Sequence, residues 1–155
     1  MDHTFLFHYE EFGSVSELAE ADRQLMQVAI EATHTAYNPY SHFSVGAAIR
    51  LNDGTLWTGS NQENIAYPSG LCAERTALFS AAAHHPQATF EALAIVGRDA
   101  SGQLVPASPC GACRQVMSEY EQRQHSPLRL LLYNTGGKIL IFESAADLLP
   151  FSFSM

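Results

Sequence analysis

Hydrophobic residues recur every three or four positions between residues 14 and 37, a spacing that predicts an amphipathic helix. One face of this helix would carry Leu18, Leu25, Met26, Ala29, Ile30 and Thr33. Ser14-Val15-Ser16-Glu17 has the form of a capping box, so we expect the helix to begin there. Proline disfavours the helical region for the residue before it, so Asn38-Pro39 should end the helix after about Tyr37.

Five later segments have the apolar and β-branched content of strands. They are residues 43–51, 55–60, 90–97, 128–133 and 138–142. Asn52-Asp53-Gly54 is a strong hairpin signal between the first two. The segment 90–97 is almost continuously apolar, which is typical of a strand covered on both faces.

Helices are predicted between these strands at residues 72–83 and, after Pro109, at 110–124, and a last short helix is predicted from Ser144 to Pro150. This alternation predicts an α/β fold, a three-layer α/β/α arrangement around a mixed, roughly five-stranded sheet. With 155 residues and no repeat or linker, we expect a single domain over 1–155. Residues 4–12, rich in Phe and Tyr, suit either a short strand or a surface arm. We therefore treat 1–13 as an N-terminal arm of unknown role.

Composition excludes several classes of function. The content of 46% hydrophobic and 15% charged residues is typical of a globular protein. Eight Lys and Arg against 16 Asp and Glu give a net charge of −8, which argues against a nucleic-acid partner but does not repel a small neutral substrate. No apolar run approaches the ~20 residues of a membrane span. The N-terminus lacks the pattern of a secretory signal, so we expect no membrane partner and a cytoplasmic location.

The three cysteines carry the clearest chemistry. Cys110 and Cys113 form a C-x-x-C pair after a proline, and Cys72 stands two residues before Glu74. Two sulfurs at the first turn of a helix can chelate one metal ion. Three protein ligands on Zn²⁺ leave a position open for water, which distinguishes a catalytic site from a closed structural one. A zinc deaminase pairs such a site with a Glu that is not a ligand, the place that Glu74 would fill.

Other interpretations of these residues stay open. The cysteines could be small buried hydrophobic residues. They could also form a structural zinc site, with His42, His84 or His85 as the fourth ligand. Arg75 could donate hydrogen bonds to a ligand sulfur and so tune the metal, or be a solvated helix residue.

Four segments together resemble the cytidine deaminases, of the short, homotetrameric, zinc-dependent type. They are NPYSHFSVGAAI (38–49), GSNQENIAYPSGLCAERTA (59–77), SPCGACRQVM (108–117) and DLLPFSF (147–153). The resemblance implies hydrolytic deamination of cytidine and 2′-deoxycytidine to uridine and 2′-deoxyuridine, with release of ammonia, in pyrimidine salvage. A zinc-bound hydroxide would be the nucleophile. It also implies a nucleoside substrate and a homotetramer.

The resemblance also implies roles for individual residues. Cys72, Cys110 and Cys113 would hold Zn²⁺, and Glu74 would be the catalytic proton shuttle. The substrate-binding residues would be Asn61 and Glu63 at the ribose 3′-hydroxyl, Phe43 at the pyrimidine, backbone groups of Ala73 and Ser108 at the base, and Phe153 from a neighbouring subunit.

Each substrate-binding role has an alternative. Asn61 and Glu63 are also ordinary for a polar, turn-rich loop, and Phe43 suits core packing equally well. Phe153 could belong to a frayed tail. Other deaminases, acting on tRNA adenosine, guanine or blasticidin S, and a zinc-stabilised binding module without catalysis are the rival functions. Among these, nucleic-acid deamination conflicts with the acidic charge.

Overall fold

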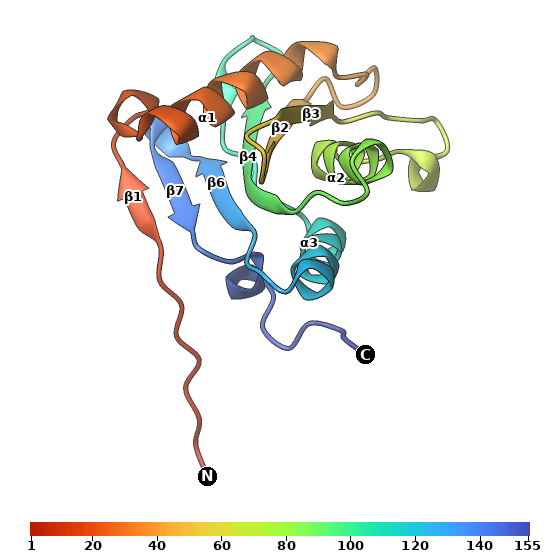
Figure 1. Ribbon diagram of the computed structural model, residues 1–155. Coiled ribbons are helices and arrows are strands. Elements are labelled where there is room, and N and C mark those ends of the chain that lie inside the picture. The colour runs from red at the N-terminus through yellow and green to blue at the C-terminus, as the bar shows by residue number, and fades with distance from the viewer.

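A seven-stranded sheet lies between two layers of helices in the computed structural model, which describes residues 1–155 (Figure 1). The long helices are α1 (Glu20–Ala32), α2 (Ala73–His84) and α3 (Gly111–Gln124). Helix α1 packs on one face of the sheet, and α2 and α3 pack on the other. The predicted three-layer α/β/α architecture is therefore confirmed. None of the helices combines the length and the apolar character needed to cross a bilayer.

The sheet has the order β1-β7-β6-β4-β2-β3, with β5 paired to β4 outside this path. The strands are β1 (Glu10–Phe12), β2 (Ser44–Leu51), β3 (Leu56–Ser60), β4 (Phe90–Arg98), β5 (Leu104–Val105), β6 (Arg129–Tyr133) and β7 (Ile139–Phe142). Only β4 and β6 are parallel, and α3 lies in the connection between them. All other pairs are antiparallel, so the sheet is mixed as predicted.

The sheet has two strands more than the roughly five that the sequence predicts. Strand β1 extends the sheet beyond β7, and the two-residue β5 pairs with Gly97 and Arg98. Both are short, and β1 begins with two glutamates, so neither has the alternation that marks a strand in sequence. Their pairing depends on neighbours that are distant along the chain.

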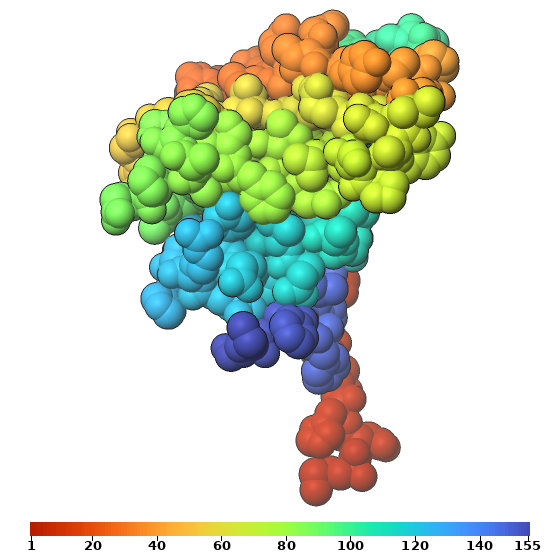
Figure 2. Space-filling view, turned by 90° about the vertical axis from the view of Figure 1, so that its right-hand side faces the viewer, coloured from red at the N-terminus to blue at the C-terminus, as the bar shows by residue number.

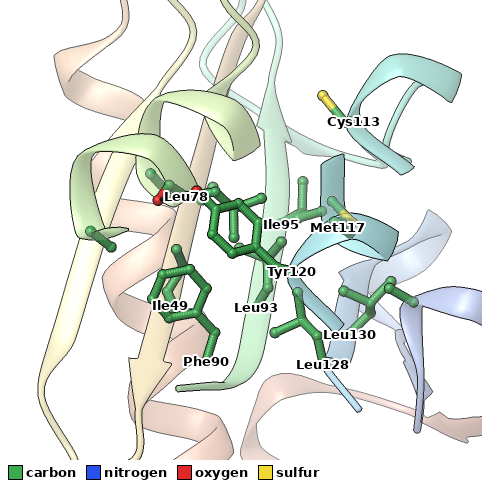
Figure 3. Close-up of a cluster of buried hydrophobic side chains, with 14 of the residues drawn as sticks. Ile49, Leu78, Phe90, Leu93, Ile95, Cys113, Met117, Tyr120, Leu128 and Leu130 are labelled. Atoms are coloured by element: carbon green, nitrogen blue, oxygen red, sulfur yellow. Dashed lines mark hydrogen bonds between the residues drawn. The ribbon is translucent and has the colours of Figure 1, made fainter. Parts of the chain in front are cut away.

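Alternate residues of the central strands fill two separate cores. Ile49, Leu93 and Ile95 point toward α2 and α3, where they meet Met117 and Tyr120 (Figure 3). Their sequence neighbours, mostly alanines, point toward α1. The apolar segment 90–97 is thus covered on both faces, as its composition predicts.

Helix α1 begins later and ends earlier than the sequence predicts. Ser14 precedes only a short 3₁₀ turn at Val15–Glu17, and its side chain makes no capping hydrogen bond. The Glu17 carboxylate instead accepts the backbone N–H of Gly13 at 2.8 Å, and the chain runs extended to Glu20. At the other end, a 3₁₀ turn at Thr33–Thr35 follows the helix. The predicted apolar face is nonetheless buried on the sheet.

Candidate functional site

Two helix N-termini converge on the three cysteines. Cys72 immediately precedes α2, and Cys110 immediately precedes α3. Their Sγ atoms lie 3.9 Å apart, and all three cysteine sulfurs, including that of Cys113 in the first turn of α3, lie within 4.8 Å of one another. The partial positive charge at the N-terminus of α2 favours the thiolate form of Cys72.

The spacing of the sulfurs fits a tetrahedral metal. Zn–S bonds of about 2.3 Å in a tetrahedron separate neighbouring sulfurs by roughly 3.8 Å, close to the distance between Cys72 and Cys110. No histidine, aspartate or glutamate joins the cluster as a fourth ligand. The rings of His84 and His85 pack instead on Trp57, with centroids 4.9 and 5.0 Å from it. The donor set is therefore three thiols, which suits zinc with one position open.

Arg75 lies beside the sulfurs and is not a free surface residue. Its Nη2 donates to Cys72 Sγ at 3.4 Å. The pKa of the Cys72 thiol is lowered to about 5, chiefly by its hydrogen bond with Cys113 and further by Arg75, against the opposing effect of burial. The hydrogen bond with Cys72, and after it burial, raise the pKa of Cys113. One guanidinium thus offsets part of the negative charge that three thiolates would place on a metal.

Glu74 is buried next to the cysteines. It is the second residue of α2 and only 4% exposed. Its pKa is raised to about 7, above all by burial and in part by the charge of Cys72. A carboxyl group in this state is suited both to accept and to release a proton near neutral pH.

A cavity of about 370 Å³ opens beside Glu74. It is lined by Phe43, Val45, Asn61, Cys72, Ala73, Glu74, Pro106, Ala107, Ser108 and Cys110. The fold thereby gathers most of the site residues predicted from sequence around one space. Val45, Pro106 and Ala107 were not predicted. Val45 was expected only as part of a strand, and nothing in the local sequence shows that the segment before Pro109 lines the cavity.

Asn61 holds the end of strand β2 at the rim of this cavity. Its Nδ2 donates to the backbone oxygen of Phe43 at 2.9 Å, and its Oδ1 accepts the N–H of Val45 at 2.7 Å. An amide side chain has two N–H groups and two acceptor lone pairs, so one of each stays available after these bonds. The residue thus has a structural task and keeps capacity for a ligand.

Glu63 lines a second, adjoining cavity of about 440 Å³. This cavity shares Asn61 and Cys72 with the first and is lined also by Arg75 and by Tyr40 and Tyr67, two aromatics that sequence did not indicate. The Glu63 carboxylate accepts the hydroxyl of Ser41 and the backbone N–H groups of Tyr40 and Ser41. These bonds, that of the Ser41 hydroxyl first, lower the pKa of Glu63.

Phe153 is the one predicted substrate-binding residue that lines neither cavity of its own chain. Its side chain is 72% exposed. Its backbone oxygen and N–H bond the amide of Gln115 on α3, at 3.0 and 3.3 Å. The tail is therefore fixed on α3 by its backbone while the ring stays exposed.

Comparison with known proteins agrees with this geometry. The profile of the cytidine and deoxycytidylate deaminase zinc-binding region matches residues 19–126. A cytidine deaminase from Sporosarcina psychrophila is 44% identical over 131 residues, which are 84% of this chain and 90% of the relative. One from Halalkalibacterium halodurans is 48% identical over 99 residues, 63% of this chain and 71% of the relative.

A solved structure gives the same result. The crystal structure of a cytidine deaminase from Burkholderia pseudomallei superposes with a TM-score of 0.72 at 45% sequence identity, covering 84% of this chain and 97% of that one. The family match covers more than half of the chain and includes all three cysteines and Glu74. The chain therefore belongs to the cytidine and deoxycytidylate deaminase family of zinc-binding enzymes.

Proposed function

We propose that this enzyme hydrolyses cytidine and 2′-deoxycytidine to uridine and 2′-deoxyuridine, releasing ammonia, as a step of pyrimidine salvage. One observation supports the proposal above the others. A buried Glu74, two cysteines of the three-sulfur cluster, and the polar Asn61 and Ser108 line the same cavity of about 370 Å³. A space of this size with a few polar groups is typical of a small-molecule site.

We propose that Cys72, Cys110 and Cys113 bind Zn²⁺. When bound, zinc acts as a Lewis acid that lowers the pKa of water toward neutrality. The Arg75 guanidinium, 3.4 Å from Cys72 Sγ, reduces the negative charge of the thiolate set, which would otherwise weaken that acidity.

Glu74 moves the protons of the reaction. Its carboxylate accepts a proton from the attacking water and delivers it to N3 of the pyrimidine, which makes C4 more electrophilic. After the C4–O bond forms, a proton passes through Glu74 to the exocyclic amino group. That group leaves as ammonia, the C4–N bond breaks, and the uracil carbonyl is formed. One carboxyl group thus serves as general base and general acid in turn.

The other residues hold the nucleoside. Phe43 packs against the pyrimidine ring, and backbone groups of Ala73 and Ser108 bond the base. Asn61 and Glu63 bond the ribose 3′-hydroxyl, because a carboxylate accepts from a hydroxyl and an amide can both donate and accept. Asn61 lines both cavities and Glu63 lines the second, which suits a substrate with the base in one cavity and the sugar in the other.

The charges around both cavities favour a neutral nucleoside over a nucleotide. The charged side chains that line them are Glu63, Glu74 and Arg75, apart from the cysteines. Arg75 is the only cation among them, and its Nη2 donates to Cys72, so its charge is directed at the cysteines and not at a 5′-phosphate. The net charge of −8 disfavours a nucleic-acid substrate for the same reason.

The loss of ultraviolet absorbance on incubation with cytidine, 2′-deoxycytidine, deoxycytidylate, cytosine, adenosine and blasticidin S tests the substrate. We expect turnover of the first two. Glu74→Gln should retain zinc and lose at least roughly 10²-fold in kcat. Glu31→Gln, an exposed glutamate on α1, is the matched control and should keep full activity. Efficient turnover of deoxycytidylate or blasticidin S alone, or full activity of Glu74→Gln, would contradict the proposal.

We propose further that Phe153 enters the substrate pocket of a neighbouring subunit in a homotetramer. Its exposed ring and fixed backbone support this. Phe153→Ala should raise KM for cytidine without loss of zinc, and sedimentation equilibrium should give a mass of at least four chains. A monomeric active enzyme would contradict the tetramer.

A further inference from the structure

The first nine residues have no backbone hydrogen bond to the rest of the chain. They run beyond β1 as an extended segment that projects from the body of the molecule (Figures 1 and 2). Strand β1 itself pairs only with β7 and forms one end of the sheet. Residues 1–12 therefore offer one long, open strand edge, a feature that proteins normally cover, charge or pair.

Aromatic side chains alternate along this arm. Phe5, Phe7 and Tyr9 share one face of the extended chain, because successive residues of a strand point to opposite sides. The ring centroids of Phe7 and Tyr9 lie 6.2 and 5.5 Å from that of Phe142. The ring centroids of Phe5 and Phe7 lie 6.5 Å apart. Each of the three arm rings remains about half exposed, which is costly for a contiguous apolar row.

We propose that the arm pairs antiparallel with the arm of a second copy of this chain, about a two-fold axis at Phe7. In this register Phe7 lies opposite Phe7 and Phe5 lies opposite Tyr9, so the aromatic rows of both copies form one continuous face. His3 lies opposite Glu11, whose carboxylate can accept a hydrogen bond from the imidazole. The interface is self-complementary, as a two-fold contact requires.

Two neighbouring registers, with the two-fold axis at Leu6 or at His8, also keep the aromatic rings on one face of the paired strands, but both are less favourable. An axis at Leu6 places Asp2 opposite Glu10, and like charges directly opposite each other are destabilising. An axis at His8 places Phe5 opposite Glu11 and breaks the aromatic row. The sequence of the arm thus specifies both the partner, a second copy, and the register.

This pairing is independent of the proposed chemistry. The arm lies before residue 19, where the family match begins, and none of its residues lines either cavity. Changes in the arm should therefore alter association and leave kcat for cytidine at the parent value.

A cysteine at the axis tests the register in the full chain. Directly opposite Cα atoms of an antiparallel pair lie about 4.5–5.5 Å apart, within the roughly 4.4–6.8 Å that a disulfide spans. Phe7→Cys at low micromolar concentration should give a covalent dimer under mild oxidation. Thr4→Cys is the control, since two such cysteines would lie six positions apart, about 20 Å. The parent chain, with the same three native cysteines, gives the background.

Sedimentation equilibrium supplies a second, non-covalent measurement. Phe7→Glu places two carboxylates at the axis and should lower the weight-average mass at a given concentration. Leu6→Glu changes the charge equally but places the carboxylate opposite His8, and should keep the parent mass. Equal cross-linking of Phe7→Cys and Thr4→Cys, or equal masses of the two glutamate variants, would overturn the proposal.

Discussion

Gly59 on β3 lies against Ala73, the first residue of α2: a Cβ built at Gly59 would be 2.7 Å from the Ala73 carbonyl oxygen. It would also lie 2.8 Å from the Cα of Ala77, one turn further along the helix. These neighbours are backbone atoms and cannot rotate away. The bare backbone of Gly59 therefore sets how closely the helix that carries Glu74 approaches the sheet.

Gly59→Ala should displace α2 and disturb the metal cluster. Overpacking of this kind costs about 1–3 kcal/mol of unfolding free energy. Because Cys72 is joined directly to Ala73, the displacement should also weaken zinc binding by about tenfold or more. Urea unfolding and a competitive zinc titration measure the two effects.

Gly46→Ala is the matched control on the opposite face of the sheet. Its Cβ would collide with the backbone oxygen of Ala29 and lie 2.8 Å from the nitrogen of Thr33, so α1 would have to move instead. We expect a similar loss of stability with unchanged zinc affinity. If both variants lose zinc equally, the link between Gly59 and the metal site is wrong.

The fold could be predicted where its signal is local. The apolar face of α1 and the alternating or buried strands follow from periodicities of 3.6 and 2 residues. The start of α1 could not be predicted, because the capping-box sequence Ser14–Glu17 is compatible with a 3₁₀ turn as well as with a helix start. Here the Glu17 carboxylate accepts the N–H of Gly13, and Val15–Glu17 form the 3₁₀ turn. Strand β5 exists only because Leu104 and Val105 reach the end of β4.

The site residues could likewise be predicted only where their signal is local in the sequence. The three cysteines and Glu74 have short, specific spacings that indicate their chemistry in the sequence alone. The bonds of Asn61 to Phe43 and Val45 link residues 18 and 16 positions apart and needed the structure. So did Tyr40 and Tyr67, whose rings form an edge-on pair 6.1 Å apart at the second cavity.

Cys110 and Cys113 should differ in what they contribute besides metal binding. Cys110 is exposed, whereas Cys113 is fully buried in the core cluster with Met117. Alanine at either position should abolish stoichiometric zinc, measured by metal analysis of the purified protein. Only Cys113→Ala should also lower the unfolding free energy of the metal-free protein, by about 1 kcal/mol, since it removes a packed side chain. Full zinc content in either variant would contradict the three-sulfur site.

Ser41 should control substrate affinity through Glu63. Its hydroxyl is the main cause that lowers the Glu63 pKa from its ordinary value of 4.5. In the proposed function the ionised carboxylate accepts the ribose hydroxyl, so KM for cytidine should rise as the pH falls through this pKa. In Ser41→Ala the pKa returns toward 4.5, so the rise in KM should begin at a higher pH. Near neutral pH, KM should be roughly 2- to 10-fold higher because the carboxylate is less firmly oriented.

KM is the informative quantity here, because loss of zinc in acid lowers the active fraction and so affects kcat. Ser126→Ala, exposed beyond the far end of α3, is the control and should follow the parent profile. Identical KM profiles for Ser41→Ala and the parent would show that Ser41 does not position Glu63.

Asp22 should stabilise the α1 layer without affecting the metal site. It is 6% exposed, and its two carboxylate oxygens bond Arg50 on β2 at 3.0 Å and Arg129 on β6 at 2.5 Å. Asp22→Asn leaves two guanidinium groups without their shared counter-charge. Breaking a fully buried pair costs about 3–5 kcal/mol, but the arginines keep some contact with water, so we expect about 2 kcal/mol in urea unfolding.

Glu20→Gln is the control for Asp22→Asn, because it breaks an exposed ion pair with Arg23 in the same helix and should cost less than about 1 kcal/mol. Both variants should bind zinc and turn over cytidine as the parent does, since α1 lies across the sheet from the cysteines. A cost for Asp22→Asn no larger than that for Glu20→Gln would mean that Arg50 and Arg129 are adequately paired by Glu91 and Glu143, which lie 3.4 and 3.0 Å from them. The comparison of the two unfolding free energies therefore distinguishes the contribution of the buried Asp22, which joins α1 to β2 and β6, from that of exposed ion pairs.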